Sequence, residues 1–299
     1  MKDALFYVIL QPKDYINAFL SSFDNPFAVW ESTFTSLCKM AQYALFVRCT
    51  MGGGAVFMKD WAKAVKYFIN SDPIISSLAW DEQSWFDCIK IIEGTFILSQ
   101  PYRGDYVVKF HNPSVYDFLV SQLSKLPELQ GHIIERSYFC DQLYRVFSDI
   151  EYSSNFGSHI IKLQEEHYPG MVNSFVRHFR TLNTCGVIER NSSSFRQNYN
   201  DFYIDRINAL EFFLKMRQSF KTIFDKRPRL YSLVSQQMLE SEKYSLLDRM
   251  AILNVMPDEI QKEYNLERIA NIVVDQVEFL NDYVNVTCEG YDGYGRIHA

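Results

Sequence analysis

The residues best placed to do chemistry lie at positions 108–119, VKFHNPSVYDFL, where an expected strand meets an expected helix. Asparagine is favoured at a helix N-cap and proline at the first helical position, so Asn112 and Pro113 predict that a helix begins here. A helix start presents unpaired N–H groups and the positive end of a dipole, which suits an anion such as a nucleotide phosphate. The same residues could serve only to cap the helix and close the domain, and the sequence leaves both interpretations open.

The motifs of common catalytic and metal sites are absent from the sequence. There is no G-x-x-x-x-G-K-[ST] phosphate loop, and we expect the three glycines at 52–54 to end a helix and permit a tight turn. The six histidines form no HExxH motif, and neither G-x-S-x-G nor CxxC occurs. We therefore expect that the chain is not an enzyme and that it binds no metal or cofactor by itself.

Charge does not favour nucleic acid as a partner. The formal net charge is −6, and the strongest basic cluster comprises Lys215, Arg217, Lys221, Lys226, Arg227 and Arg229. Lys221, Lys226, Arg227 and Arg229 could form a basic partner surface, although such runs usually line a solvated helix end. The helix expected at 81–93 carries four acidic residues against Lys90, so phosphate would repel it. We expect a protein partner.

Composition indicates a folded, mostly helical chain. Of the 299 residues 47% are hydrophobic, and only 12 are glycine and 9 proline, so long segments run without helix breakers. Six scattered cysteines fit a reducing compartment, and no apolar run reaches the roughly 18 residues that a membrane span needs. The expectation is a soluble cytoplasmic protein without membrane contact, and a chain of this length favours two domains.

The first domain is expected at residues 1–125. Apolar spacing predicts helices at 14–23, 27–51, 57–69 and 81–93. Two strands follow at 95–99 and 106–110, joined by a turn at 101–105 that contains proline, glycine and aspartate. Helices followed by such a hairpin have the order of a winged-helix-like α+β domain.

The second domain is expected at 126–299, as an all-helical bundle or irregular α-solenoid. Helices are predicted at 132–150, 171–182, 205–224, 230–239, 245–254 and 266–283. The polar residues 191–194 predict a loop, and the glycine-rich tail from about residue 289 is expected to be disordered. The fold class is thus mainly α with one β-hairpin.

Residues 110–119, FHNPSVYDFL, resemble the motif F-x-N-P-S-x-x-D-F-L of the STAND NTPases, the signal-transduction ATPases with numerous domains. Asn25-Pro26, Trp30-Glu31 and the helical run 34–47 are similar to the start of the winged-helix domain in that family, so the resemblance covers about residues 14–125. It implies nucleotide sensing by Asn112, with His111 and Ser114 as further candidates. The packing part of the motif is Phe110, Pro113, Asp117, Phe118 and Leu119. The family commonly has histidine at the sensing position, so Asn112 is a departure.

The resemblance also implies an architecture. Members carry an effector, then a P-loop ATPase, then a sensor, and commonly act in prokaryotic conflict or antiviral defence. This sequence lacks the first two parts, so ADP or ATP is expected only where an upstream ATPase domain, in cis or in trans, supplies the pocket. Residues 126–299 would be the sensor or an arm leading to it, and self-association is a further expectation. The chain could be a fragment, a degraded or split gene product, or a stand-alone relative.

The leading hypothesis is a non-catalytic regulatory module of a STAND-type switch. A winged-helix DNA-binding regulator, a stand-alone helical scaffold for protein interactions and a catalytic module with an unrecognised site remain as alternatives.

Overall fold

The structure, a computed structural model, describes residues 26–71, 80–150, 160–185, 187–190, 202–205 and 208–240, together with 252, 256 and 257. Contacts group the chain into two compact units, Met1–Ile223 and Phe224–Ala299. The division thus follows Ile223, whereas the sequence suggested one after residue 125. Four predicted features lie outside the described residues: the helix at 14–23, the loop at 191–194, the helix at 266–283 and the tail from 289. Of the helix predicted at 245–254, only Ile252 is described.

The chain is mainly α with a small β part, as predicted, and its first half has winged-helix order. After α2 (Pro26–Ser36), the elements are α3 (Lys39–Thr50), β1 (Ala55–Phe57), α4 (Met58–Ser71), α5 (Glu82–Ile92), β2 (Ile97–Tyr102) and β3 (Asp105–Phe110). Strand β3 pairs antiparallel with both β2 and β1, with Val108 opposite Ser99 and Val56. Strand β1 was not predicted, because three residues are too few to show the alternation of a strand.

The turn of the hairpin is tighter than predicted. Strands β2 and β3 extend to Tyr102 and from Asp105, so only Arg103 and Gly104 connect them. Both residues have positive φ, 47° and 79°, as the two-residue turns that match strand twist require. Pro101 belongs to β2, which is an edge strand, where the missing N–H of proline is tolerated.

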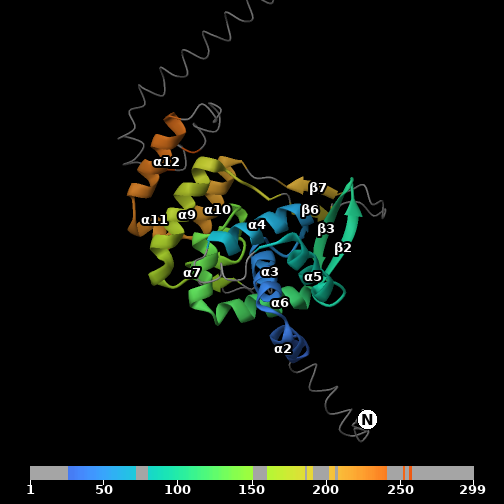
Figure 1. The fold of residues 1–299 in the computed structure, drawn as a ribbon. Coiled ribbons are helices and arrows are strands. Elements are labelled where there is room, and N and C mark those ends of the chain that lie inside the picture. The colour runs from blue at the N-terminus through green and yellow to red at the C-terminus, as the bar shows by residue number, and fades with distance from the viewer. Residues whose placement is uncertain are drawn as a thin grey trace, which may run out of the picture. The chain divides into compact units, whose positions relative to one another are not determined.

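The prediction that the second half is all-helical is wrong. Strands β6 (Val187–Arg190) and β7 (Phe202–Asp205) extend the first sheet to the order β2-β3-β1-β6-β7 (Figure 1). Two further strands, β4 (Phe147–Ser148) and β5 (Ile161–Lys162), pair in parallel. All four contain only two to four residues, and β6 pairs with β1, which is more than 130 positions away, so local periodicity could not reveal them.

The remaining helices are α6 (Pro113–Ser124), α7 (Pro127–Glu135), α8 (Asp141–Tyr144), α9 (Tyr168–Thr181), α10 (Ala209–Ser219), α11 (Lys221–Lys226) and α12 (Arg229–Glu240), besides the short 3₁₀ turn Glu165–His167. Instead of the single helix predicted at 132–150, the chain forms the end of α7, then the whole of α8 and then β4. The one predicted at 205–224 is the end of β7, followed by α10 and the start of α11. In the second unit, Phe224 packs on Tyr231 with ring centroids 5.4 Å apart.

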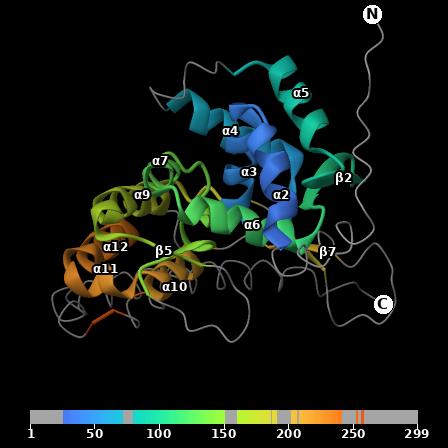
Figure 2. The ribbon, with the colours of Figure 1, turned by 90° about the horizontal axis from the view of Figure 1, so that it is seen from below.

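Helix α3 forms the centre of the first unit, where α6 lies beside it (Figures 1 and 2). Nine of its twelve residues are buried, among them the polar Arg48 and Thr50, so the helix is enclosed on more than one side. Phe34 of α2 meets Phe46 of α3 and Phe118 of α6, with ring centroids 5.3 and 5.6 Å apart. Trp61 of α4 donates an indole hydrogen bond to the carbonyl of Ala44 at 2.9 Å.

Within the described part of the chain, no helix has both the length and the hydropathy needed to span a membrane.

The hairpin turn yields a stability prediction. Because asparagine adopts positive φ at a lower cost than arginine, Arg103→Asn should raise the free energy of unfolding by about 0.5–1 kcal/mol, measured by urea denaturation. The β-branched change Arg103→Val should lower it. If both variants shift stability in the same direction, turn conformation does not govern this site.

Candidate functional site

The junction between β3 and α6 has the capped geometry that the sequence predicted. Asn112 is the N-cap of α6, with extended φ and ψ of −140° and 144°, and its Oδ1 accepts a hydrogen bond from the Ser114 amide at 3.0 Å. Pro113 occupies the first turn. The Val115 amide donates to the Asn112 carbonyl at 3.0 Å, so the helix start satisfies part of its own amide groups.

Two side chains of this junction present polar groups to solvent. His111 and Asn112 are both exposed. No described residue accepts a hydrogen bond from the Nδ2 amino group of Asn112, which leaves two N–H donors for an external acceptor. The Nδ1 atom of His111 lies 3.3 Å from the Thr95 carbonyl, a contact that makes Nδ1 the donor and leaves Nε2 outward.

The third candidate, Ser114, faces the protein. Its Oγ accepts a hydrogen bond from the Trp30 indole at 3.3 Å, which ties α2 to the start of α6. Ser114 therefore positions the junction, whereas His111 and Asn112 are open to a partner.

The remaining motif residues anchor α6. Phe118 and Leu119 are fully buried, and Phe110 is 7% exposed, with its ring packed on Tyr116 at 5.6 Å. Asp117 lies half-buried in the second turn of α6. The buried side chains of Phe110, Phe118 and Leu119 thus hold the exposed end of the junction in place.

A buried guanidinium group, which was not predicted from the sequence, packs against the Phe110 ring. Arg48 of α3 is 0% exposed, and it donates to the carbonyls of Gly52, Gly54 and Val108. Its Cζ lies 4.6 Å from the centroid of the Phe110 ring. Burial lowers the pKa of Arg48 to about 10. The signal in the sequence was a charged residue among apolar ones, four positions before three successive glycines.

A second buried polar centre is the side chain of Asp141 in α8, which is 1% exposed. Its carboxylate accepts hydrogen bonds from the Cys185 amide at 2.9 Å, the Tyr144 hydroxyl at 2.9 Å and the Arg145 guanidinium at 3.2 Å. The neighbouring Gln142 donates to Thr50 of α3 at 3.1 Å. These contacts join residues 141–185 to the winged-helix elements.

Four of the five described cysteines are buried, and Cys38 is exposed. Burial raises the pKa of the Cys88 thiol to about 12 and also raises the pKa values of Cys49, Cys140 and Cys185, so these groups remain thiols. Ser137 Oγ lies 2.8 Å from His178 Nε2, but both residues are at most 2% exposed, so no substrate can reach them. In the described part of the chain no cluster of three metal-ligating residues occurs.

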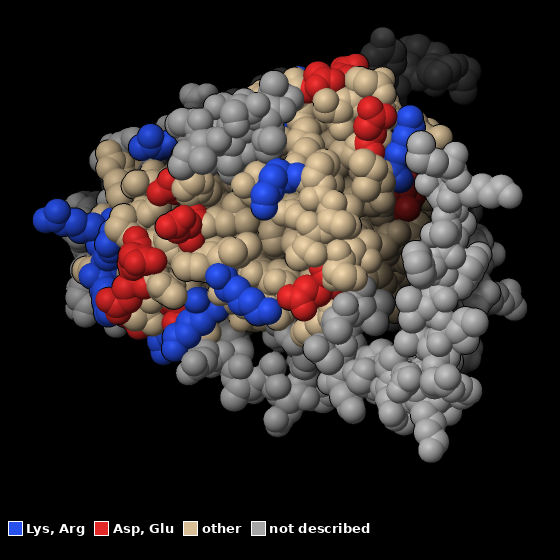
Figure 3. Space-filling model, turned by 60° about the horizontal axis from the view of Figure 1, so that its bottom comes forward, with Lys and Arg blue, Asp and Glu red and all other residues tan. Residues whose placement is uncertain are grey.

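The basic residues of α11 and the following turn do not define a site. Lys221, Lys226, Arg227 and Arg229 are all exposed, but Lys221 belongs to the first unit and the others to the second. On the face drawn in Figure 3, lysine and arginine side chains lie among acidic ones, with uncharged surface between them. The charge distribution on that face is mixed instead of basic.

Comparison with known proteins finds no matching family model, no matching curated protein and no matching solved structure.

The buried guanidinium yields a prediction about stability. Arg48→Met should lower the free energy of unfolding by at least about 2 kcal/mol, because it leaves buried carbonyls without donors. Lys59→Met is the control, since Lys59 is an exposed partner of Asp105 at 2.7 Å and its loss should cost less than about 1 kcal/mol. Equal losses in the two variants would show that Arg48 contributes no more than a surface cation.

His178 yields a prediction about pH. Burial, followed by the nearby Arg177 charge, lowers the pKa of His178 to about 3 from 6.5, so the folded state holds this ring neutral. Below pH 6.5 the unfolded chain gains a proton that the folded chain does not, and stability should fall by up to about 1.4 kcal/mol per pH unit until about pH 3. In His178→Gln, chemical denaturation at pH 7, 6 and 5 should show a shallower loss than in the wild type. Parallel curves for the two proteins would contradict this.

Proposed function

We propose that this chain is a non-catalytic regulatory module of a STAND-type NTPase switch, which couples the binding of a ligand or partner to a nucleotide-bound core. The core is a P-loop ATPase domain, in cis or in trans, and it supplies the ADP or ATP pocket. The setting is the cytoplasm, in prokaryotic signalling or antiviral defence. The observation that carries the proposal is the exposed pair His111 and Asn112 at a capped helix start, in a domain with winged-helix order.

The chemistry of the junction fits a phosphate. The two N–H donors of Asn112 Nδ2 can bond phosphate oxygens, and the positive end of the α6 dipole lies beside them. A nucleotide that contacts this junction from the ATPase domain stabilises the closed arrangement, and loss of that contact shifts the population towards the open one.

The acidic character of α5 weighs against the alternative of a DNA-binding regulator. The exposed face of this helix carries Glu82, Asp87 and Glu93, with Lys90 3.6 Å from Asp87. The third helix of a winged helix would thus meet DNA phosphates with negative charge.

One observation favours a protein-interaction scaffold as the second candidate function. Phe86 and Ile91 project from α5 with 59% and 54% of their surface exposed. Apolar side chains this exposed suit a protein surface.

Variants of Asn112 that preserve the helix cap test the sensing role. The tagged full chain is purified from its native cells, associated P-loop ATPases are identified by mass spectrometry, and bound ADP is measured by chromatography. Aspartate and serine cap helices about as well as asparagine. Asn112→Asp places a carboxylate against the phosphate and should reduce retained ADP by roughly tenfold, whereas Asn112→Ser should cause a smaller loss.

Thermal denaturation of both variants is the control, and their melting temperatures should match. Equal ADP retention in the wild type and both variants would show that Asn112 does not sense the nucleotide. If no P-loop ATPase is associated with the chain, the switch proposal is wrong and the scaffold becomes the better interpretation.

A further inference from the structure

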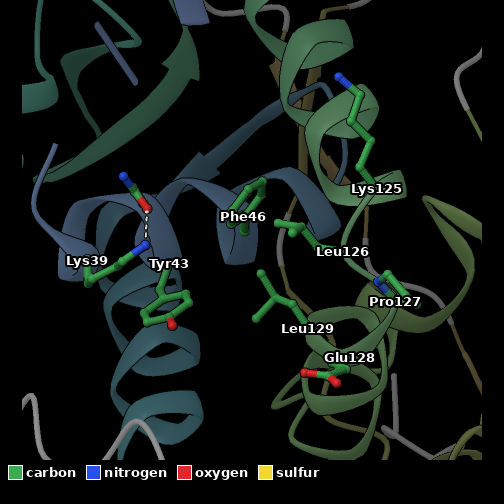
Figure 4. A pocket seen from close by; sticks show the side chains of 9 residues that line it. Lys39, Tyr43, Phe46, Lys125, Leu126, Pro127, Glu128 and Leu129 are labelled. Carbon is green, nitrogen blue, oxygen red and sulfur yellow. Dashed lines mark hydrogen bonds between the residues drawn. The ribbon is translucent and has the colours of Figure 1, made fainter. Parts of the chain in front are cut away.

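A cavity of about 450 Å³ lies between α3 and the turn that joins α6 to α7 (Figure 4). Small-molecule sites commonly occupy about 300–1,000 Å³ and combine apolar walls with a few polar groups. This cavity is separate from the exposed end of the junction, since it adjoins the last turn of α6 and not the first.

Apolar side chains line the cavity from two sides. Tyr43 and Phe46 belong to α3, and Phe46 is 3% exposed. Leu126 and Leu129 lie opposite and point towards the α3 side (Figure 4). Leu126 is 42% exposed. A flat or branched apolar body placed between the two walls would remove this surface from water.

The ammonium group of Lys39 at the rim of the cavity forms no ion pair with a described residue. Lys39 is the first residue of α3, where the helix dipole disfavours a cation and the first turn holds no acidic residue. Among the described residues, Gln42 is the partner of this ammonium group, at 3.2 Å from its Oε1. The Gln42 amide is itself fixed by bonds of 3.1 Å to the carbonyls of Phe34 and Leu37, so the ammonium group is held at the rim.

Two other charged residues line the cavity, Glu128 and Lys125. Glu128 lies in the first turn of α7, where the helix dipole favours a carboxylate. Lys125 extends away from the apolar walls (Figure 4). A ligand at the rim would therefore meet the positive charge of Lys39, with the exposed carboxylate of Glu128 also in the lining.

We infer that this cavity binds a small amphipathic organic anion. The aromatic or branched aliphatic body lies between Tyr43 and Phe46 on one side and Leu126 and Leu129 on the other. The carboxylate or sulfonate faces Lys39. The inference does not depend on the proposed nucleotide sensing, because the two sites share no residue.

The test uses the full chain and 8-anilinonaphthalene-1-sulfonate, a fluorescent aromatic sulfonate. The wild type should bind the dye at one saturable site. Lys39→Glu should weaken binding by roughly tenfold through reversal of the rim charge, and Leu126→Ser should weaken it by a similar factor through loss of apolar contact. Both residues are exposed, so both variants should fold, which circular dichroism checks.

Matched controls lie outside the cavity. Lys66→Glu makes the same charge change at an exposed lysine of α4, and Leu214→Ser makes the same polar change at a leucine of 38% exposure in α10. Neither should change the dissociation constant. N-phenyl-1-naphthylamine, which lacks the sulfonate, should bind more weakly and should be insensitive to Lys39→Glu.

The inference fails if the dye shows no saturable binding, or if the control variants weaken binding as much as the cavity variants. If the wild type binds the neutral dye as tightly as the sulfonate dye, the inference that the ligand is an anion is wrong. None of these outcomes bears on ADP retention by the Asn112 variants.

Discussion

The winged-helix half of this protein depends on the burial of one guanidinium. Arg48 is fully enclosed, and its Nη1 and Nη2 groups donate hydrogen bonds to the carbonyls of Gly52, Gly54 and Val108, so all three carbonyls must point inward, whereas its buried Nε has no hydrogen-bond partner among the described residues. This requirement fixes the glycine loop, the start of β1 and the path of β3 relative to α3. Carbonyls carry only partial charges, so they compensate a buried cation less fully than a carboxylate does. The face of the Phe110 ring contributes to this compensation.

The second buried centre explains why the first compact unit extends well beyond the winged helix. Asp141 collects donors from α8 and from Cys185, directly before β6, and Gln142 reaches Thr50 at the end of α3. Asp149 extends the connection, because its carboxylate accepts the Ile223 amide at 2.7 Å. Polar groups buried in this way are costly to separate, so they tie the described part of residues 141–223 to α3. The division after residue 125 followed from local helix and strand signals and from the extent of the family resemblance, which carry no trace of these bonds.

Local signals predicted the parts of the structure that local chemistry decides. Asn112 and Pro113 marked the start of α6, and residues 81–93 contained α5 with Asp81 as its cap, because capping involves neighbours in the sequence. Strand β1 and its partner β6 were missed, since their stability comes from pairing across the chain. The same reason hid the roles of Arg48 and Asp141, whose partners lie up to 60 and 44 positions away. Of the candidate site, the capping residues could therefore be found from the sequence, but not the buried groups that hold them.

Helix α6 connects the two surfaces that are open to ligands. Asn112 caps its first turn, and Leu126 follows its last, so the two sites are separated by one rigid element of about 18 Å. Val115, Phe118, Leu119 and Leu123 are fully buried, and this continuous apolar face makes the helix move as a whole or not at all. A ligand at either surface would affect the other only if it bound two positions of α6 with different affinity.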